Sequence, residues 1–181
     1  MARAMNERRP RAGGLFVGRL DAESGTGTLL EALDLYPGAR VEVIGAGPEE
    51  PRLRAHARVR LLGRVGPAEV QARMRGASYL VLPSLCYELQ PRPLVEAFAN
   101  GLPVIASRIG RLAEIVEPGR NGLLFEPGSA RDLARRLAWA EAFPEKMRQM
   151  GDCAKADYEA RFLADWSYQR LFGERRRAAR I

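Results

Sequence analysis

The chain has 181 residues, of which 46% are hydrophobic and 28% are charged, and its formal net charge is +7. This length suits one globular domain, and the composition excludes a disordered or collagen-like chain. No run approaches the roughly 18 apolar residues of a transmembrane helix, and the arginine-rich N-terminus lacks the apolar segment of a secretory signal.

The positive charge is concentrated at the two ends of the chain. Residues 1–11 contain four arginines and one glutamate, and residues 170–181 contain five arginines and one glutamate, so residues 12–169 are neutral overall. A nucleic-acid module more often carries its charge on the folded face, which argues against nucleic acid as a partner. We expect a cytoplasmic protein with solvated termini; peripheral contact with the inner membrane face through these basic ends stays an alternative.

The cysteines and the histidine predict no catalytic or metal chemistry. Cys86 and Cys153 have neither metal-ligand spacing nor a disulfide framework, which favours a reducing compartment. No histidine lies near Cys86 in the sequence, so we interpret it as a small buried thiol. His56, the single histidine, lies in an arginine-rich stretch away from every other motif. We interpret it as a solvent-facing structural residue, and we expect neither a metal nor a cofactor.

Strand-like and helix-like segments alternate along the chain. Strands are predicted over residues 15–20, 40–44, 59–62, 79–82, 104–106 and 123–125, and helices over 26–36, 49–57, 67–75 and 92–100, with a helical turn over 112–116. After Gly128 the pattern predicts helices that end near residues 142, 162 and 172. The alternation predicts an α/β fold, a Rossmann-like doubly wound parallel sheet of about six strands with a helical C-terminal segment.

We divide the chain into three parts on this basis. Residues 1–13 form an irregular basic arm, residues 14–162 the Rossmann-like domain, and residues 163–181 a C-terminal helix with a basic tail. Ligands of doubly wound folds bind at the carboxyl ends of the strands. The loops that follow the predicted strands, after Leu20, Ile44, Leu62, Leu82 and Ala106, meet at that edge of the sheet.

The most informative stretch runs from Leu82 to Pro127. It contains Glu88 and Glu96, which are separated by seven residues across a loop-to-helix junction. A carboxylate can accept hydrogen bonds from neighbouring hydroxyl groups, and the start of a helix suits an anion. The stretch therefore predicts a site for a ligand that carries both hydroxyls and phosphates.

These residues resemble the donor-sugar site of GT-B glycosyltransferases of family 4, the glycosyl transferases group 1. The family's E-x7-E pattern corresponds to Glu88 and Glu96. Four further segments, 16–25, 101–107, 110–116 and 122–128, are similar to family motifs and follow in family order over roughly residues 14–140. The resemblance implies the C-terminal half of a GT-B fold, with a hexosyltransferase-type reaction. In that reaction a sugar passes from an NDP-sugar to an acceptor hydroxyl, usually with retention and without a bound metal.

The resemblance also implies roles for individual residues. Arg19 would contact the donor diphosphate and Glu88 the transferred sugar, and these two are the candidate catalytic residues. Glu96 would hold the ribose hydroxyls. The other candidate donor-binding residues are Gly18, Ser24, Gly45, Gly47, Arg64, Val65, Pro91, Arg92, Pro93, Leu94 and Val95.

The sequence departs from the family pattern within this site. Ser24 stands where the family usually has a diphosphate-binding lysine, and Ala46 stands where aspartate is common. Leu89 and Gln90 replace a Phe-Gly or Phe-Pro pair. Because one phosphate-facing charge is lost, we expect either that Arg92 compensates or that donor binding is weak.

The sequence does not identify the donor, which we expect to be a UDP-, GDP- or ADP-sugar. Four interpretations stay open: a fragment of a full glycosyltransferase, a stand-alone domain, a degenerate module, or a basic-tailed nucleic-acid binder. The stand-alone domain would act with an N-terminal acceptor domain in trans or as a homo-oligomer, and the degenerate module would bind nucleotide-sugars or a partner without catalysis. An NAD site at Gly45 and Gly47 is disfavoured, because Glu50 replaces the third glycine of that fingerprint and Pro48 interrupts it.

Overall fold

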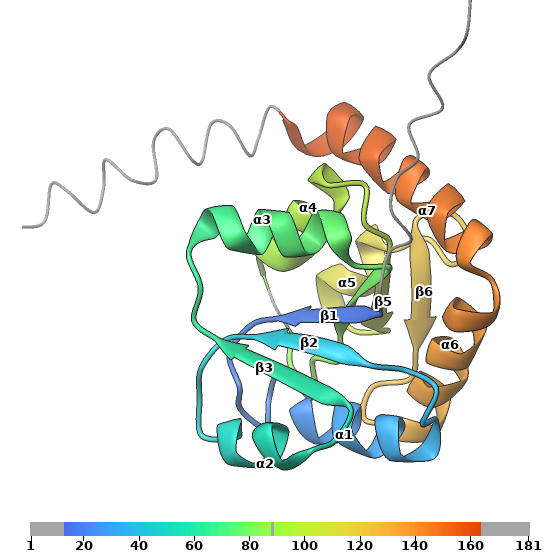
Figure 1. Cartoon of the computed structure of the whole chain (residues 1–181). Helices are drawn as coiled ribbons and strands as arrows, with labels where there is room; N and C mark the ends of the chain where they lie inside the picture. Colours follow the sequence, from blue (N-terminus) through green and yellow to red (C-terminus); the bar gives the residue numbers. More distant parts are fainter. Residues whose placement is uncertain (1–12, 88, 164–181) are drawn as a thin grey trace, which may run out of the picture.

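A computed structural model describes residues 13–87 and 89–163 of the chain. In this part of the chain six parallel strands form one sheet in the order β3-β2-β1-β4-β5-β6 (Figure 1). The strands are β1 (Gly14–Val17), β2 (Val41–Ile44), β3 (Val59–Gly63), β4 (Tyr79–Leu82), β5 (Val104–Ser107) and β6 (Gly122–Phe125). The predicted Rossmann-like doubly wound sheet is confirmed.

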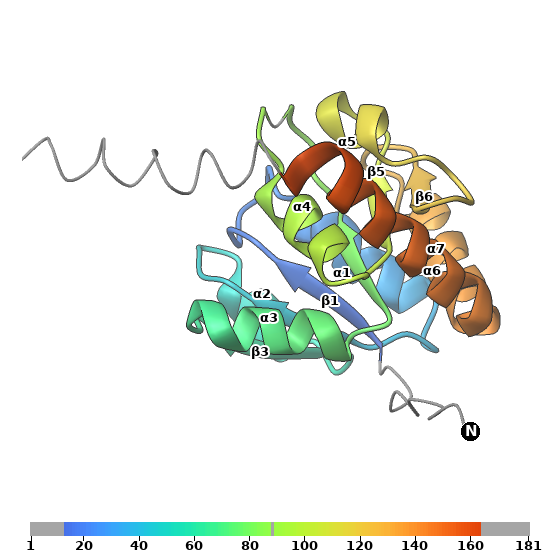
Figure 2. The same cartoon turned by 90° about the horizontal axis from the view of Figure 1, so that it is seen from above.

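Helices cover both faces of this sheet (Figures 1 and 2). They are α1 (Thr26–Leu35), α2 (Glu50–Ala55), α3 (Pro67–Gly76), α4 (Arg92–Ala99), α5 (Gly110–Ile115), α6 (Ala130–Ala142) and α7 (Pro144–Asp157), which continues into the π-helical turn η1 (Tyr158–Phe162). Buried side chains of α1, α2 and α6 belong to one core cluster, and those of α3, α4 and α5 belong to the other. The long helix α7 contributes to both, because it crosses from one face to the other.

The alternation of side chains along the strands builds these two cores. On β4, Tyr79 and Val81 belong to the cluster under α1 and α6, whereas Leu80 and Leu82 belong to the cluster under α3 and α4. Every residue of β4, β5 and β6 is buried. This arrangement explains the near-continuous apolar runs in the sequence, because a parallel sheet covered on both faces needs apolar side chains at every position.

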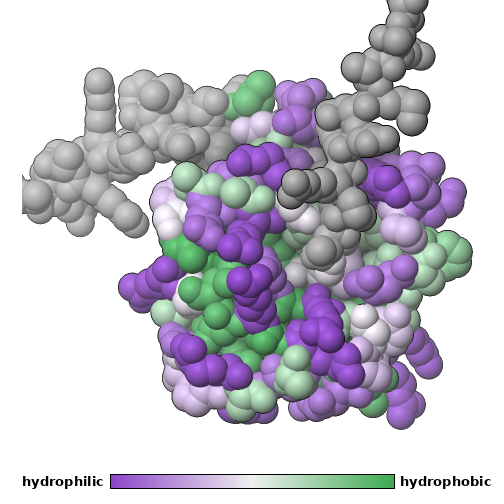
Figure 3. Space-filling model, viewed as in Figure 1, coloured by the Kyte–Doolittle hydropathy of each residue, from purple (hydrophilic) through white to green (hydrophobic). Residues whose placement is uncertain are grey.

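The strand β3 forms one edge of the sheet, and charged side chains border it. Figure 3 shows an apolar area on this side of the molecule, crossed by hydrophilic side chains. Glu42 on β2 binds Arg60 on β3 at 3.2 Å and Arg73 on α3 at 3.1 Å. Charges on an edge strand oppose the addition of a strand from another chain.

Some predicted boundaries differ from the structure. The first strand ends at Val17, because residues 18–20 already belong to the following loop. The helix predicted to reach residue 162 is α7 followed by the π-helical turn. The predicted helix over 163–172 and the basic arm over 1–13 lie outside the described residues, except for Leu163 and Gly13.

The start of α1 lies against the end of β4. Gly25 precedes α1 with φ of 75°, and a Cβ at this position would collide with the carbonyl oxygen of Pro83. The Leu85 N–H donates to the Glu23 carbonyl over 2.8 Å. The loop after β1 is therefore held against the loop after β4 by direct contact between main chains.

A buried carboxylate joins α7 to the loop between α5 and β6. Asp157 is 5% exposed, and its carboxylate accepts two hydrogen bonds from Arg120, at 2.6 and 2.7 Å, and one from the Asn121 amide at 2.9 Å. The Asn121 oxygen in turn accepts the Glu117 N–H at 2.8 Å. The hydrogen bonds from Arg120 hold the pKa of Asp157 below its ordinary value.

We predict that Gly25→Ala lowers the free energy of unfolding by about 3 kcal/mol or more, because the methyl group meets main chain and the residue must keep a positive φ. Gly27→Ala is the matched control. A Cβ at Gly27 meets no other segment within 4 Å, so we expect a gain of up to about 1 kcal/mol from helix propensity. Urea unfolding of both variants measures the difference, and equal stabilities would contradict the contact.

We also predict that Asp157→Asn lowers the free energy of unfolding by about 1–3 kcal/mol at pH 7, because Arg120 loses its buried anionic partner. The folded-state pKa lies below the unfolded one, so this stabilisation is present above about pH 4 and disappears as the pH falls through the folded-state pKa. Unfolding measured from pH 7 to pH 3 should show the two proteins converging in acid.

The control for this variant is Glu117→Gln. Its carboxylate forms exposed ion pairs with Arg120 at 3.4 Å and with Arg161 at 3.5 Å. Exposed pairs contribute less than about 1 kcal/mol. If Glu117→Gln lost as much free energy of unfolding as Asp157→Asn, the buried carboxylate would contribute no more to stability than the exposed one.

Candidate functional site

Main-chain hydrogen bonds connect the loops at the carboxyl edge of the sheet. The Gly18 N–H donates to the Ile44 carbonyl at 3.0 Å, and the Leu20 N–H donates to the Ala46 carbonyl at 3.1 Å. The Glu49 N–H donates back to the Leu20 carbonyl at 2.9 Å. The loops after β1 and β2 therefore form one continuous surface.

Gly45 and Gly47 make this contact possible. A Cβ at Gly45, which has φ of 152°, would collide with the Gly18 carbonyl oxygen, and a Cβ at Gly47 would collide with that of Leu20. The Gly47 N–H donates to the Glu50 carboxylate at 3.2 Å. These glycines thus have a packing role, and their contact with a donor stays a prediction.

Arg19 projects from the loop between β1 and α1. Its side chain is 76% exposed, and its Nη2 lies 2.5 Å from the Asp21 carboxylate and 3.8 Å from that of Glu23. Asp21 Oδ1 accepts hydrogen bonds from the Ser24 N–H at 2.9 Å and from the Ser24 hydroxyl at 2.8 Å. Ser24, a predicted donor-binding residue, thus binds a carboxylate of its own loop.

Asp21 was not among the residues predicted from the sequence. Burial acts to raise the pKa of its carboxyl, but the hydrogen bonds from Ser24 and the contact with Arg19 hold that pKa below its ordinary value. Aspartate followed three residues later by serine is a spacing in which the carboxylate caps the local turn. That spacing was the signal in the sequence, although it does not show that the same carboxylate also binds Arg19.

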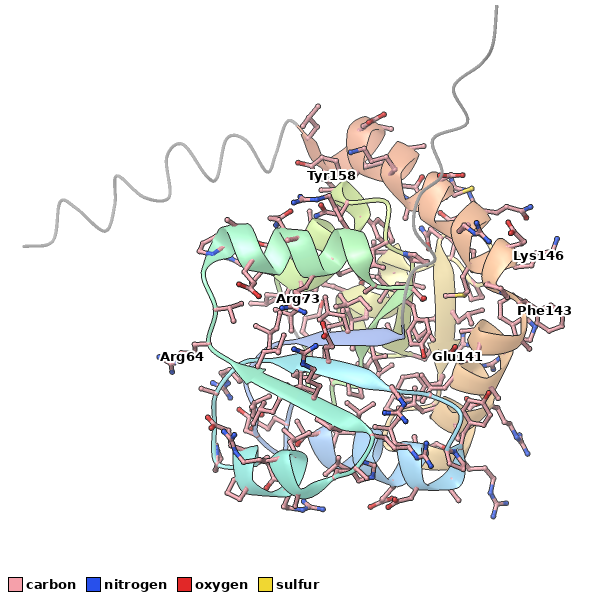
Figure 4. The ribbon with its side chains drawn as sticks, viewed as in Figure 1. Arg64, Arg73, Glu141, Phe143, Lys146 and Tyr158 are labelled. Carbon is pink, nitrogen blue, oxygen red and sulfur yellow. The ribbon has the colours of Figure 1, made fainter. Side chains whose placement is uncertain are left out.

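Arg64 and Val65 follow β3 at the same edge. The Gly45 N–H donates to the Gly63 carbonyl at 2.9 Å, which brings the loop after β3 next to the loop after β2. Arg64 is exposed and projects outward from the end of β3 (Figure 4), whereas Val65 is half-buried against the core. Of this pair, only Arg64 extends into solvent.

The loop between β4 and α4 carries the first glutamate of the predicted pair. Glu88 itself lies outside the described residues, so its assigned role stays a prediction. In the described part of this loop, the apolar side chains of Leu85, Tyr87 and Leu89 are all exposed. The Tyr87 ring lies directly over Gly110 at the start of α5, where a Cβ would collide with it.

The start of α4 holds most of the remaining predicted residues. Pro91, Leu94 and Val95 are buried, Arg92 is exposed, and Glu96 is half-buried one turn into the helix. Leu94 and Val95 therefore belong to the core and Pro93 is half-buried, whereas the contact of Arg92 and Glu96 with a donor stays a prediction.

The main-chain donors at this helix start already have acceptors. The Arg92 N–H donates to the Gln90 carbonyl at 2.8 Å, and the Leu94 N–H donates to the Pro91 carbonyl at 3.1 Å. Pro93 has no N–H. For an anion, α4 thus offers the Arg92 side chain more readily than the main-chain amides that the sequence suggested.

His56 lies away from this edge, as expected, but it is less exposed than we predicted. Its side chain is 14% exposed, its Nδ1 accepts the Arg58 N–H at 3.3 Å, and its Nε2 lies 3.1 Å from the Asp34 carboxylate. Among the residues that the structure describes, no cluster of histidine, cysteine and acidic side chains could hold a metal ion. No helix in this part of the chain is long and apolar enough to cross a bilayer.

Comparison with known proteins relates the chain to a family. Residues 12–140 match the glycosyl transferases group 1 family. The chain is 33% identical over 163 residues to the phosphatidyl-myo-inositol mannosyltransferase of Mycobacterium leprae, covering 84% of this chain and 42% of that protein. It is 35% identical over 144 residues to an exopolysaccharide phosphotransferase of Streptomyces coelicolor, covering 75% of this chain and 15% of that protein.

Solved structures agree with this relationship. HepE from Anabaena in complex with UDP-glucose superimposes with a TM-score of 0.74 at 26% identity, covering 83% of this chain and 45% of that one. The C-terminal domain of a group 1 family protein from Francisella tularensis has the same fold, with a TM-score of 0.71 at 23% identity. It covers 87% of this chain and 89% of that domain. The chain thus spans less than half of the curated relatives named above, and it belongs to the glycosyl transferases group 1 family.

Proposed function

We propose that this chain is the donor-binding part of a glycosyltransferase that moves a sugar from an NDP-sugar to an acceptor hydroxyl. The observation that carries the proposal is the convergence of Arg19, Arg64, Arg92 and Glu96 on the loops and helix starts at the carboxyl edge of the sheet. Ligands of doubly wound folds bind at this edge. The similarity to HepE, solved in complex with UDP-glucose, supports a nucleotide-sugar as the ligand.

In this proposal, each side chain meets a different part of the donor. Glu96 accepts hydrogen bonds from the two ribose hydroxyls, a role suited to a half-buried carboxylate at a helix start. Arg19 binds the diphosphate, and its planar guanidinium matches the geometry of phosphate oxygens. Glu88 contacts the transferred sugar. Arg64 and Val65 lie beside the nucleotide base, which is uracil, guanine or adenine.

The reaction needs positive charge near the departing diphosphate. In the loop after β1, the single positive charge of Arg19 is paired with the carboxylates of Asp21 and Glu23. Ser24 adds no positive charge to this loop. We therefore assign Arg92 as the second cation, since it is exposed at the start of α4. Electrostatic stabilisation of the leaving group by fixed cations is a large term in such reactions. We propose retention of configuration and a reaction that does not use a metal.

The acceptor site belongs to a part of the protein outside this donor-binding unit. The chain covers 42% of the mannosyltransferase and 45% of HepE, so more than half of each lies beyond the matched region. We propose that an N-terminal acceptor domain, joined or in trans, completes the enzyme, which acts in the cytoplasm. The apolar side chains of Leu85, Tyr87 and Leu89 are exposed in the loop between β4 and α4, and we assign them to the side from which the acceptor arrives.

A second candidate is a nucleotide-sugar-binding or interaction module without catalysis. Two observations favour it: Ser24 binds Asp21 and carries no charge towards the diphosphate, and Leu89 and Gln90 stand where the family has a Phe-Gly or Phe-Pro pair. Donor binding distinguishes both candidates from a domain that has lost the donor site altogether. A transfer assay with the complete enzyme then distinguishes the glycosyltransferase from the module without catalysis.

We predict that the chain binds one of UDP-, GDP- or ADP-sugar with micromolar to sub-millimolar affinity, and that Glu96→Ala abolishes this binding without unfolding the protein. Isothermal titration calorimetry measures the affinity, and circular dichroism checks the fold. Glu31→Ala, an exposed glutamate on α1, is the matched control and should bind normally. Retained affinity in Glu96→Ala would overturn the ribose assignment, and no binding of any donor to the wild-type chain would overturn the proposed function.

A further inference from the structure

The carboxylate of Asp21 is divided between two partners. Its Oδ1 accepts both the N–H and the hydroxyl of Ser24, and its Oδ2 receives Nη2 of Arg19 at 2.5 Å. The main-chain carbonyl of Asp21 also accepts the Thr26 hydroxyl at 3.1 Å. Asp21 is thus fixed at its side chain and at its main chain, on the segment that leads into α1.

Within residues 13–87 and 89–163, Arg19 has ion pairs with Asp21 and, at a longer distance, with Glu23. Its side chain is 76% exposed, whereas that of Asp21 is 20% exposed. A solvent-exposed arginine loses roughly 2 kcal/mol of side-chain freedom when a ligand immobilises it. A contact that already restricts the guanidinium before the ligand arrives reduces that loss and raises the affinity.

The way in which Arg19 is held leaves donors for a ligand. Within the described residues, the contact of Arg19 with each carboxylate is made by Nη2. A guanidinium has further N–H groups on Nη1 and Nε, and these can reach an anion while Nη2 stays with Asp21. The contact with Asp21 therefore restricts the guanidinium without using up its capacity to bind phosphate.

We propose that Asp21 is a positioning residue for the donor diphosphate: supported by Ser24, it holds Arg19 in place for the phosphate oxygens. This inference rests on the proposed donor-binding function. It also gives the serine at position 24 a function, since its hydroxyl and N–H orient the carboxylate that orients Arg19. Arg19 touches the diphosphate, and Asp21 acts only through Arg19.

Glu23 provides a control that distinguishes the positioning of Arg19 by Asp21 from the effect of a negative charge near the diphosphate. Its carboxylate is 71% exposed and lies 3.8 Å from the same Nη2, beyond hydrogen-bond distance. Glu23→Gln therefore removes the same charge from the same loop and leaves the close contact of Arg19 intact. If Asp21 were only a negative charge that competes with the diphosphate, the two neutral variants would behave alike.

The test is a calorimetric titration of UDP, GDP and ADP into the wild-type chain, Asp21→Asn, Glu23→Gln, Arg19→Gln and the double variant Arg19→Gln/Asp21→Asn. The corresponding nucleosides are titrated by ligand-observed NMR. We expect Asp21→Asn to raise the Kd of the bound nucleoside diphosphate about three- to tenfold, because the guanidinium is no longer pre-oriented. Nucleoside binding should not change, Glu23→Gln should stay within about twofold of wild type, and Asp21→Asn should add no loss in the Arg19→Gln background.

Three results would overturn the inference. The first is an Asp21→Asn variant that binds the diphosphate as tightly as wild type or more tightly. The second is an equal loss for diphosphate and nucleoside, which would indicate a distorted loop. The third is a loss of diphosphate affinity on adding Asp21→Asn to Arg19→Gln that is as large as the loss in the wild-type chain.

Two further measurements complete the test. Ser24→Ala, which removes one of the two supports of Asp21, should weaken diphosphate binding in the same direction and by less; unchanged binding would contradict the role given to Ser24. A wild-type chain that binds none of the three diphosphates overturns the donor-binding function itself, and this outcome is distinct from intact wild-type binding with an unaffected Asp21→Asn.

Discussion

The candidate site depends on close contact between main chains at the carboxyl edge of the sheet. Gly25 lies against the Pro83 carbonyl, and Gly45 lies against that of Gly18, at distances that leave no room for a Cβ. These contacts fix the loops after β1, β2 and β4 relative to one another without side chains. The side chains of these loops can therefore differ from the usual pattern of the family, as Ser24 and Ala46 do, while the frame that presents Arg19 is kept.

The two cores give this frame its rigidity. Apolar side chains from opposite faces of each strand are covered by different helices, and α7 closes both cores by crossing from one face to the other. The pairing of Asp157 with Arg120 and Asn121 fixes the point at which α7 passes the loop before β6. Because the strands are held in this way, residues at their carboxyl ends keep fixed relative positions, which a binding site for an extended ligand such as a nucleotide-sugar requires.

The electrostatics of the site differ from what the resemblance alone implies. The loop after β1 has one arginine against two carboxylates, and Ser24 is engaged by one of them. Under the proposed function, affinity for a diphosphate comes from few cations that are well oriented, with Arg92 supplied by α4. Orientation and number of charges are alternative ways to stabilise the same anion, because restricting a guanidinium beforehand reduces the entropy lost on binding.

The sequence by itself determined the fold and the edge of the sheet at which the candidate site residues lie. Apolar runs of strand length alternate with amphipathic helices, and glycines and prolines mark the loops, so the doubly wound sheet and the placement of Arg19 and Glu96 follow from local pattern. Only the tertiary structure decided which polar groups are already engaged: Leu94 N–H with Pro91, Gly47 N–H with Glu50, and Arg19 with Asp21. The physical reason is that periodicity reports which face of an element is buried, whereas a hydrogen bond depends on distances and directions set by the packing of whole elements.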